Sequence, residues 1–389
     1  MAEDRGRRQG EGRVIYLDYQ ATTPVAPEAA KAMLPWIDEK FANPHSPSRW
    51  GSEADAAIEV ARKRVEAAIG LKGGSVAFTG SATEAINWAL KGSFEKAAVE
   101  RKGARNRILT VATEHAAVLD TCEWLAGQGI DLTVLPVKPN GRLDLDLLER
   151  ELDERVLMVA VMQVNNEIGV TQPISEIAKM AHDRGALMLC DAVQALGKVE
   201  VCKGPDLVAV SAHKIYGPKA IGALWMRKGA EPAPLIHGGG QERGLRSGTL
   251  SPALCVGFNA AAKLADERMT RDYDHVQKLW TAAIHALGKG WIVNGGTQHR
   301  YRGNLNIRRE GVDGARLIAD LRDIAFSLGS ACASGSGRPS HVLRALGLDY
   351  RQARSSIRLG FGRYTKQKEL VDACHRIAAA AHAQEKLDA

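Results

Sequence analysis

The sequence predicts an α/β fold with a mainly parallel sheet in a large domain, followed by a smaller α+β domain. From about residue 75 to residue 225, short apolar runs rich in β-branched residues alternate with segments of helical spacing. Such alternation is typical of a parallel sheet covered by helices. From about residue 266 the chain becomes rich in helical patterns. Its 389 residues are enough for two hydrophobic cores.

The expected elements follow in order. Residues 14–18 should form a short strand, and residues 26–40 and 50–69 have helical spacing. The run 43–47, which contains two prolines, should separate these helices. Seven strands should form the sheet, at residues 75–79, 107–111, 132–135, 156–161, 186–190, 206–210 and 221–226.

These patterns divide the chain into four parts. Residues 1–13 mix arginine with acidic residues and lack an apolar stretch, so we expect a disordered tail and not a signal or transit peptide. Residues 14–25 should pack with the small domain, and residues 26–265 should form the large domain. Residues 266–389 should form the small domain, which includes a glycine- and serine-rich loop at about 327–340.

Composition argues against several classes of protein. No apolar run approaches the roughly 18 residues that cross a bilayer, so we expect a cytoplasmic protein without membrane contact. The net charge of +7 arises between residues 300 and 363, which hold twelve arginines and five acidic residues. No nucleic-acid-binding module accompanies this excess, so direct nucleic-acid binding is not expected. The six cysteines include no Cys-x-x-Cys pair, which argues against a structural metal site.

The most informative stretch is Ser-Ala-His-Lys-Ile-Tyr-Gly-Pro-Lys at 211–219. Lys214 follows the predicted strand 206–210, and Asp191 follows the predicted strand 186–190. Open α/β sheets bind ligands at the carboxyl ends of their strands. Pyridoxal phosphate needs a lysine for a Schiff base and a carboxylate for its ring nitrogen. The alternative is a surface lysine and a helix-capping aspartate, and the pairing of the two favours the cofactor.

Further polar residues follow other predicted strands. The run 80–84, Gly-Ser-Ala-Thr-Glu, opens a helix and could bind a phosphate through free N–H groups, or could be a simple capping box. His115 could stack on a cofactor ring and move protons, or could be structural. Asn166 could bind a cofactor oxygen or a substrate carboxylate, or belong to a turn. Gln194 should face the same crevice.

Two residues of the C-terminal third could also take part in catalysis or ligand binding. Cys332 lies in the glycine- and serine-rich run 327–337, where an accessible thiol is either a nucleophile or an idle surface cysteine. Arg358 leaves the strand-like run 355–359. A fixed guanidinium is a natural partner for a carboxylate, although Arg358 could equally be one more member of the basic region.

Taken in order, these motifs resemble those of cysteine desulfurases of the NifS/IscS-like group, in the class V aminotransferase family of fold-type I pyridoxal phosphate enzymes. The resemblance extends from about Ile15 to Thr365. Its motifs are YLDYQATTP (16–24), TEHAAVLD (113–120), VNNEIGV (164–170), DAVQ (191–194), SAHKIYGPK (211–219), HGGGQERGLRSGT (237–249), GSACAS (329–334) and SSIR (355–358). At 80–81 the chain reads Gly-Ser where the family usually has Ser-Gly.

The resemblance implies a role for each candidate. Lys214 would bind the cofactor covalently, His115 would stack on its ring, Asp191 would pair with the ring nitrogen and Gln194 would bond the phenolic oxygen. Asn166 and Arg358 would bind the substrate carboxylate. The phosphate would contact Ala82, Thr83, Ser211 and His213, and Thr249 from the other subunit of a homodimer.

The implied reaction converts L-cysteine to L-alanine and leaves a persulfide on Cys332. Sulfur would then pass to an acceptor or an iron–sulfur scaffold protein, which the arginine excess could attract electrostatically unless internal ion pairs absorb it. No resident metal is implied, although Cys332 could be a transient ligand of an iron–sulfur cluster. Selenocysteine lyase, aminotransferase and non-catalytic sulfur-relay protein are the alternatives.

Overall fold

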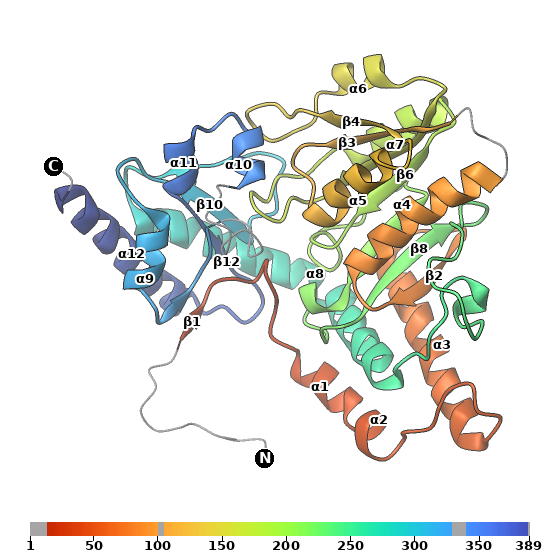
Figure 1. Cartoon of the computed structure of the whole chain (residues 1–389). Helices are drawn as coiled ribbons and strands as arrows, with labels where there is room; N and C mark the ends of the chain where they lie inside the picture. Colours follow the sequence, from red (N-terminus) through yellow and green to blue (C-terminus); the bar gives the residue numbers. More distant parts are fainter. Residues whose placement is uncertain (1–13, 100–104, 329–339, 388–389) are drawn as a thin grey trace.

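A computed structural model describes residues 14–99, 105–328 and 340–387, and its centre is a seven-stranded sheet (Figure 1). The strand order is β2-β8-β7-β6-β5-β3-β4. All seven predicted strands are present: β2 (Gly74–Thr79), β3 (Arg107–Val111), β4 (Asp131–Leu135), β5 (Val156–Met162), β6 (Leu187–Asp191), β7 (Leu207–Ser211) and β8 (Gly222–Arg227). The five strands from β4 to β7 run parallel, and β8 runs antiparallel to both of its neighbours.

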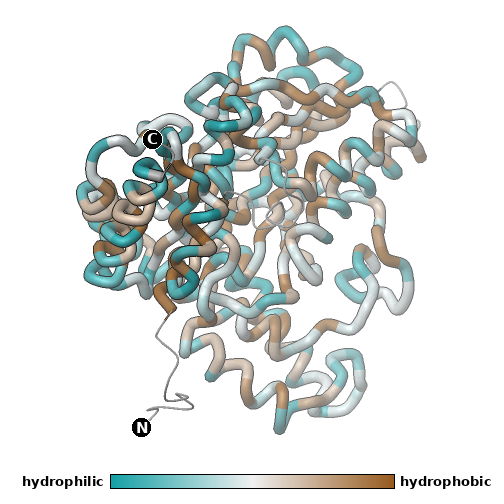
Figure 2. Tube along the Cα trace, turned by 60° about the vertical axis from the view of Figure 1, so that its left-hand side comes forward, coloured by the Kyte–Doolittle hydropathy of each residue, from teal (hydrophilic) through white to brown (hydrophobic). Residues whose placement is uncertain are grey.

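Helices cover both faces of this sheet, which explains why its central strands β5, β6 and β7 are almost entirely apolar. Every residue of β5 is buried, as expected of a strand between two helical layers. Alternate strand residues such as Ile108 and Leu109 belong to separate cores on the two faces. One core includes α4 (Ala82–Val99) and α5 (Ala116–Ala126), and the other includes α3 (Arg49–Ile69), α7 (Ile174–Asp183) and α8 (Pro252–Leu287). Hydrophobic and hydrophilic residues are interspersed along the helical turns of the chain (Figure 2).

The C-terminal part contains a second, antiparallel sheet with the order β12-β10-β9. The N-terminal strand β1 (Ile15–Tyr16) pairs with β11 (Ile324–Ala325), so the first described residues pack against this part. The other elements of this part are β9 (Ile292–Val293), β10 (Asn304–Arg308), α9 (Gly314–Asp320), α10 (His341–Ala345), α11 (Tyr350–Arg354), β12 (Ser356–Gly360) and α12 (Gln367–Leu387). In the large sheet's part of the chain, α6 (Leu145–Glu151) lies between β4 and β5.

Several element boundaries differ from the prediction. Proline divides the expected helix 26–40 into α1 (Pro27–Met33) and α2 (Pro35–Asp38). The helix α8 passes without a break through the boundary placed at residue 265, so the four-part division of the chain remains a prediction. Arg358 lies in the middle of β12 and does not leave it. Within the described ranges, no helix is both long enough and apolar enough to cross a membrane.

Candidate active site

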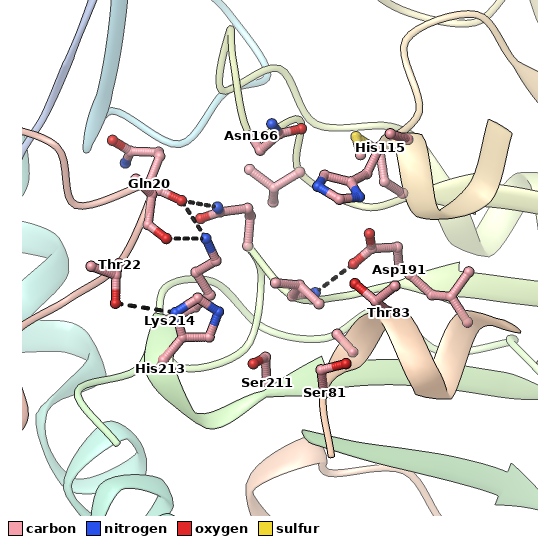
Figure 3. A pocket seen from close by; sticks show the side chains of 18 of the residues that line it. Gln20, Thr22, Ser81, Thr83, His115, Asn166, Asp191, Ser211, His213 and Lys214 are labelled. Carbon is pink, nitrogen blue, oxygen red and sulfur yellow. Dashed lines mark hydrogen bonds between the residues drawn. The ribbon is translucent and has the colours of Figure 1, made fainter. Parts of the chain in front are cut away.

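The carboxyl ends of the central strands open onto one cavity of about 740 Å³ (Figure 3). Asp191 is the last residue of β6, and Ser211 is the last residue of β7. A short 3₁₀ turn, η1 (Ala212–Lys214), follows β7 directly and carries Lys214 into the cavity wall. Parallel strands end at the same edge of a sheet, and this topology brings the lysine and the aspartate together.

Ten of the twelve predicted site residues line this cavity. They are Ala82, Thr83, His115, Asn166, Asp191, Gln194, Ser211, His213, Lys214 and Arg358. Thr249 is exposed and lies outside the lining of the cavity of its own chain. Cys332 lies outside the described residues.

The N-terminal segment holds the amine of Lys214. Its Nζ donates hydrogen bonds to the backbone oxygens of Gln20 (2.5 Å) and Ala21 (2.7 Å) (Figure 3). Thr22 hydrogen-bonds to the ring of His213 at 3.1 Å, and burial with the charge of Lys214 lowers the pKa of that histidine to about 4. The segment therefore closes one side of the site, a role that the sequence did not indicate for residues 20–22.

Asp191 is buried beneath the cavity with little to balance a negative charge. Burial raises the pKa of its carboxyl, although the N–H of Val193 bonds to it at 2.9 Å and the charges of His115 and Lys214 act in the opposite direction. Burial also raises the pKa of the neighbouring Glu114 well above its ordinary value. A cationic ligand would stabilise the ionised carboxylate of Asp191. The protonated ring nitrogen of pyridoxal phosphate is such a cation.

His115 is the N-cap of α5 as well as a wall of the cavity. Its Nδ1 accepts a hydrogen bond from the backbone N–H of Ala117 at 3.0 Å. An accepting Nδ1 carries no proton, so the neutral ring must carry its proton on Nε2. The helix thus fixes both the place of the imidazole and its tautomer.

The start of α4 forms a cradle of free N–H groups. The hydroxyl of Ser81 accepts a hydrogen bond from the N–H of Glu84 at 3.1 Å, so the predicted cap exists. This cap leaves the N–H groups of Ala82 and Thr83 available for an anion. Gly222 of β8 lies against the cradle, and a Cβ there would be 2.5 Å from the carbonyl carbon of Ser81 and 2.6 Å from the nitrogen of Ala82.

Arg358 is an interior residue and not part of a basic surface, since only 1% of it is exposed. Its Nη2 pairs with a carboxylate oxygen of Asp18 at 2.7 Å, and its Nη1 donates to the backbone oxygen of Asn166 at 3.0 Å. The side-chain oxygen of Asn166 is buried and has no hydrogen-bond partner among the described residues. A buried acceptor beside a cavity is best satisfied by a ligand or by water.

Besides residues 20–22, the cavity lining includes Glu167 and His341, two ionisable residues that the sequence did not mark as site residues. Glu167 is fully buried and accepts a hydrogen bond from the hydroxyl of Ser340, and burial raises the pKa of its carboxyl. His341 begins α10 and hydrogen-bonds through Nε2 to the backbone oxygen of Glu114 at 2.8 Å. The sequence signal for Glu167 was its place next to Asn166 in the polar run that follows the predicted strand 156–161, whereas nothing in the sequence around His341 connects it to the sheet edge.

This fold and this site define the class of protein. An α/β sheet with a lysine, a buried aspartate and a helix N-terminus around one cavity is the arrangement of a fold-type I transferase. The aminotransferase class-V model matches residues 15–373, and the chain belongs to that family.

Within this family, the chain is similar over most of its length to several cysteine desulfurases and NifS-like proteins. Cysteine desulfurase IscS of Rickettsia bellii is 45% identical over 365 residues, which cover 92% of this chain and 88% of the relative. A solved NifS-like protein superposes with a TM-score of 0.87 at 32% identity, covering 95% of this chain and 100% of the other. SspA in complex with cysteine superposes with a TM-score of 0.80 at 32% identity, covering 90% of this chain and 99% of the other.

Proposed function

We propose that this protein is a pyridoxal phosphate-dependent cysteine desulfurase, a sulfurtransferase that converts L-cysteine to L-alanine. The observation that carries the proposal is the single cavity in which Lys214, Asp191, His115 and Arg358 meet. Relatives named cysteine desulfurase, similar over most of the chain, support this choice over a selenocysteine lyase or another aminotransferase. We place the enzyme in the cytoplasm as part of the proposal.

The residues present fit the cofactor. When bound, pyridoxal phosphate supplies an electron sink attached to Lys214 as a Schiff base. Asp191 would hold the ring nitrogen, His115 would lie on the ring, and Gln194 would donate to the phenolic oxygen. The phosphate would contact the cradle residues Ala82 and Thr83, the end of β7 at Ser211 and His213, and Thr249 of the partner subunit.

The remaining residues act on the amino acid. Nη1 and Nη2 of Arg358 each carry a second N–H, which leaves two donors for the substrate carboxylate beside the existing contacts to Asp18 and Asn166. The side-chain amide of Asn166, which lines the same cavity, would add its N–H donors to the binding of that carboxylate. Once displaced from the cofactor, Nζ of Lys214 is the base that moves the substrate α-proton.

Sulfur transfer is assigned to Cys332 on its sequence alone. Its thiolate would attack the substrate sulfur, so that an S–S bond forms as the C–S bond breaks and the electron pair remains on carbon. Protonation of that carbon yields alanine. The persulfide would then deliver sulfur to an acceptor or an iron–sulfur scaffold protein.

A homodimer belongs to the same proposal. Leu34, Ile37, Phe41 and Trp50, from the end of α1 to the start of α3, are each 62–71% exposed. So many large apolar side chains in one region mark an interaction surface. The exposed position of Thr249 suits a residue that contacts the cofactor of a partner subunit.

The test is substrate discrimination by the purified, cofactor-loaded protein. Alanine formation would be measured with L-cysteine and with L-selenocysteine, and amino transfer would be measured with a keto acid. We expect alanine from L-cysteine at a rate well above background, and no amino transfer. Preference for L-selenocysteine would indicate a lyase, and transfer to the keto acid would indicate an aminotransferase.

A further inference from the structure

Lys198 lies behind the cavity wall, four residues after Gln194 in the segment that follows β6. Its Nζ donates a hydrogen bond to Oε1 of Gln194, and it lies 5.7 Å from the centre of the Tyr301 ring. The side chain is partly buried and does not line the cavity itself. No role in the proposed reaction requires an amine at this position.

A lysine in this place carries an energetic cost. Burial, together with the positive charge of Lys214, lowers the pKa of Lys198 to about 7. The groups that face it are Lys214, the Tyr301 ring and His213, and no carboxylate among the described residues shifts its pKa. A methionine would fill similar space without this charge, so packing alone does not account for the lysine.

The hydrogen bond from Lys198 defines what Gln194 presents to the cavity. With Oε1 engaged by the ammonium group, the amide has only its two N–H donors left. One of them bonds to the backbone oxygen of Gln20 at 3.0 Å, and the other is left for a ligand. While Lys198 is protonated, its charge on Oε1 also polarises the amide, which makes that N–H a stronger donor.

We propose that Lys198 is a positioning residue of the cofactor site, which acts through Gln194 to strengthen its hydrogen bond to the phenolic oxygen of the cofactor. This inference rests on the proposed function. The positive charge and the strengthened hydrogen bond have the same effect on the linkage between Lys214 and the cofactor. The charge of Lys198 repels the proton on the nitrogen of this linkage. The strengthened hydrogen bond makes the phenolic oxygen a poorer acceptor for the same proton. Both effects lower the pKa of the linkage.

The experiment is a spectroscopic pH titration of the cofactor-loaded protein. The visible absorbance of the lysine-bound cofactor would be followed from pH 5.5 to 9.5 in wild type and in Lys198→Met, Lys198→Gln and Lys198→Arg. The glutamine variant keeps a donor without charge, and the arginine variant keeps the charge. Lys179→Met is the matched control, since Lys179 is an exposed lysine paired with Asp183 on α7.

We expect Lys198→Met to raise the midpoint pH of the absorbance change by at least ~0.5 unit, with Lys198→Gln in between. Lys179→Met should titrate like wild type, and the midpoint of Lys198→Arg should be no higher than that of wild type, because arginine stays charged across this pH range. The unfolding temperature of cofactor-free Lys198→Met should not fall, because a costly buried charge is removed. Midpoints equal to that of wild type in both the methionine and glutamine variants would overturn this inference and leave the proposed function standing. Absence of a Lys214-dependent band from wild type would overturn the proposed function and this inference with it.

Discussion

Arg358 lies in a strand of the small antiparallel sheet and lines the cavity. Its position in the centre of β12 fixes its backbone, and Asp18 and Asn166 fix its guanidinium before any ligand arrives. A preorganised cation of this kind loses little side-chain entropy when a carboxylate binds. The sequence suggested the carboxylate partner, but it could not show that Asp18, 340 residues away, would share the arginine.

We predict that Arg358→Ala lowers kcat/KM for L-cysteine at least ~30-fold, since a charge-assisted pair in a partly desolvated site contributes about 2–4 kcal/mol. Steady-state alanine formation is the measurement. Arg351→Ala is the control, because Arg351 is exposed on α11. Equal efficiency in the Arg358 variant and wild type would mean that the substrate carboxylate binds elsewhere.

Asp191 should oppose folding of the cofactor-free protein while favouring cofactor binding. A buried carboxyl with a raised pKa binds more protons when folded, so its contribution to stability falls as pH rises above the unfolded value of about 4. We predict that Asp191→Asn raises the cofactor-free Tm at pH 7 by about 1–3 °C and weakens cofactor binding. Calorimetry and a cofactor-binding titration would check both. A lowered Tm, or unchanged cofactor affinity, would contradict this assignment.

At the scale of elements, the contact between β8 and the start of α4 shapes the phosphate cradle. We predict that Gly222→Ala weakens cofactor binding at least ~10-fold, because the added methyl must displace the backbone of Ser81 and Ala82. Equilibrium binding of pyridoxal phosphate is the measurement. Gly127→Ala, at the end of α5, is the control with a more distant nearest contact of 3.2 Å. Wild-type affinity in the Gly222 variant would place the phosphate elsewhere.

The strands and helices were largely predictable from the sequence, because periodicity and turn chemistry depend on residues that are close together in the chain. Apolar runs bounded by polar residues located all seven strands of the main sheet, and the strand ends then located Lys214 and Asp191. Contacts between distant segments were not predictable in this way. The N-terminal carbonyls at Lys214 and the Lys198–Gln194 pair depend on tertiary packing, which no local pattern reports.

At the scale of the whole molecule, the arginine excess of residues 300–363 is not simply a surface charge. Arg300, Arg358 and Arg363 are buried. Arg309 pairs with Glu385, and Arg354 pairs with Asp313. Burial and ion pairs within the chain therefore take up a share of the charge that could otherwise attract an acidic acceptor.

Dimerisation should be required for full cofactor affinity. We predict that the pair of changes Phe41→Glu and Trp50→Glu, at two exposed positions, produces a monomer, because two charges would enter the apolar contact proposed between the subunits. Light scattering would report the mass, and a binding titration would report weaker cofactor affinity. Tyr350→Glu is the control at another exposed aromatic position. A dimer with wild-type affinity would exclude this surface as the interface.

In the proposed reaction, one cavity uses Lys214 and the cofactor to release sulfur from L-cysteine onto Cys332. Mass spectrometry of the protein after L-cysteine, together with an alanine assay, tests it most directly in wild type, Lys214→Ala and Cys332→Ala. We predict a persulfide on Cys332 and alanine from wild type, neither from Lys214→Ala, and an intact cofactor band without alanine from Cys332→Ala. Alanine formation by Cys332→Ala at the wild-type rate, or a persulfide in Lys214→Ala, would contradict the account.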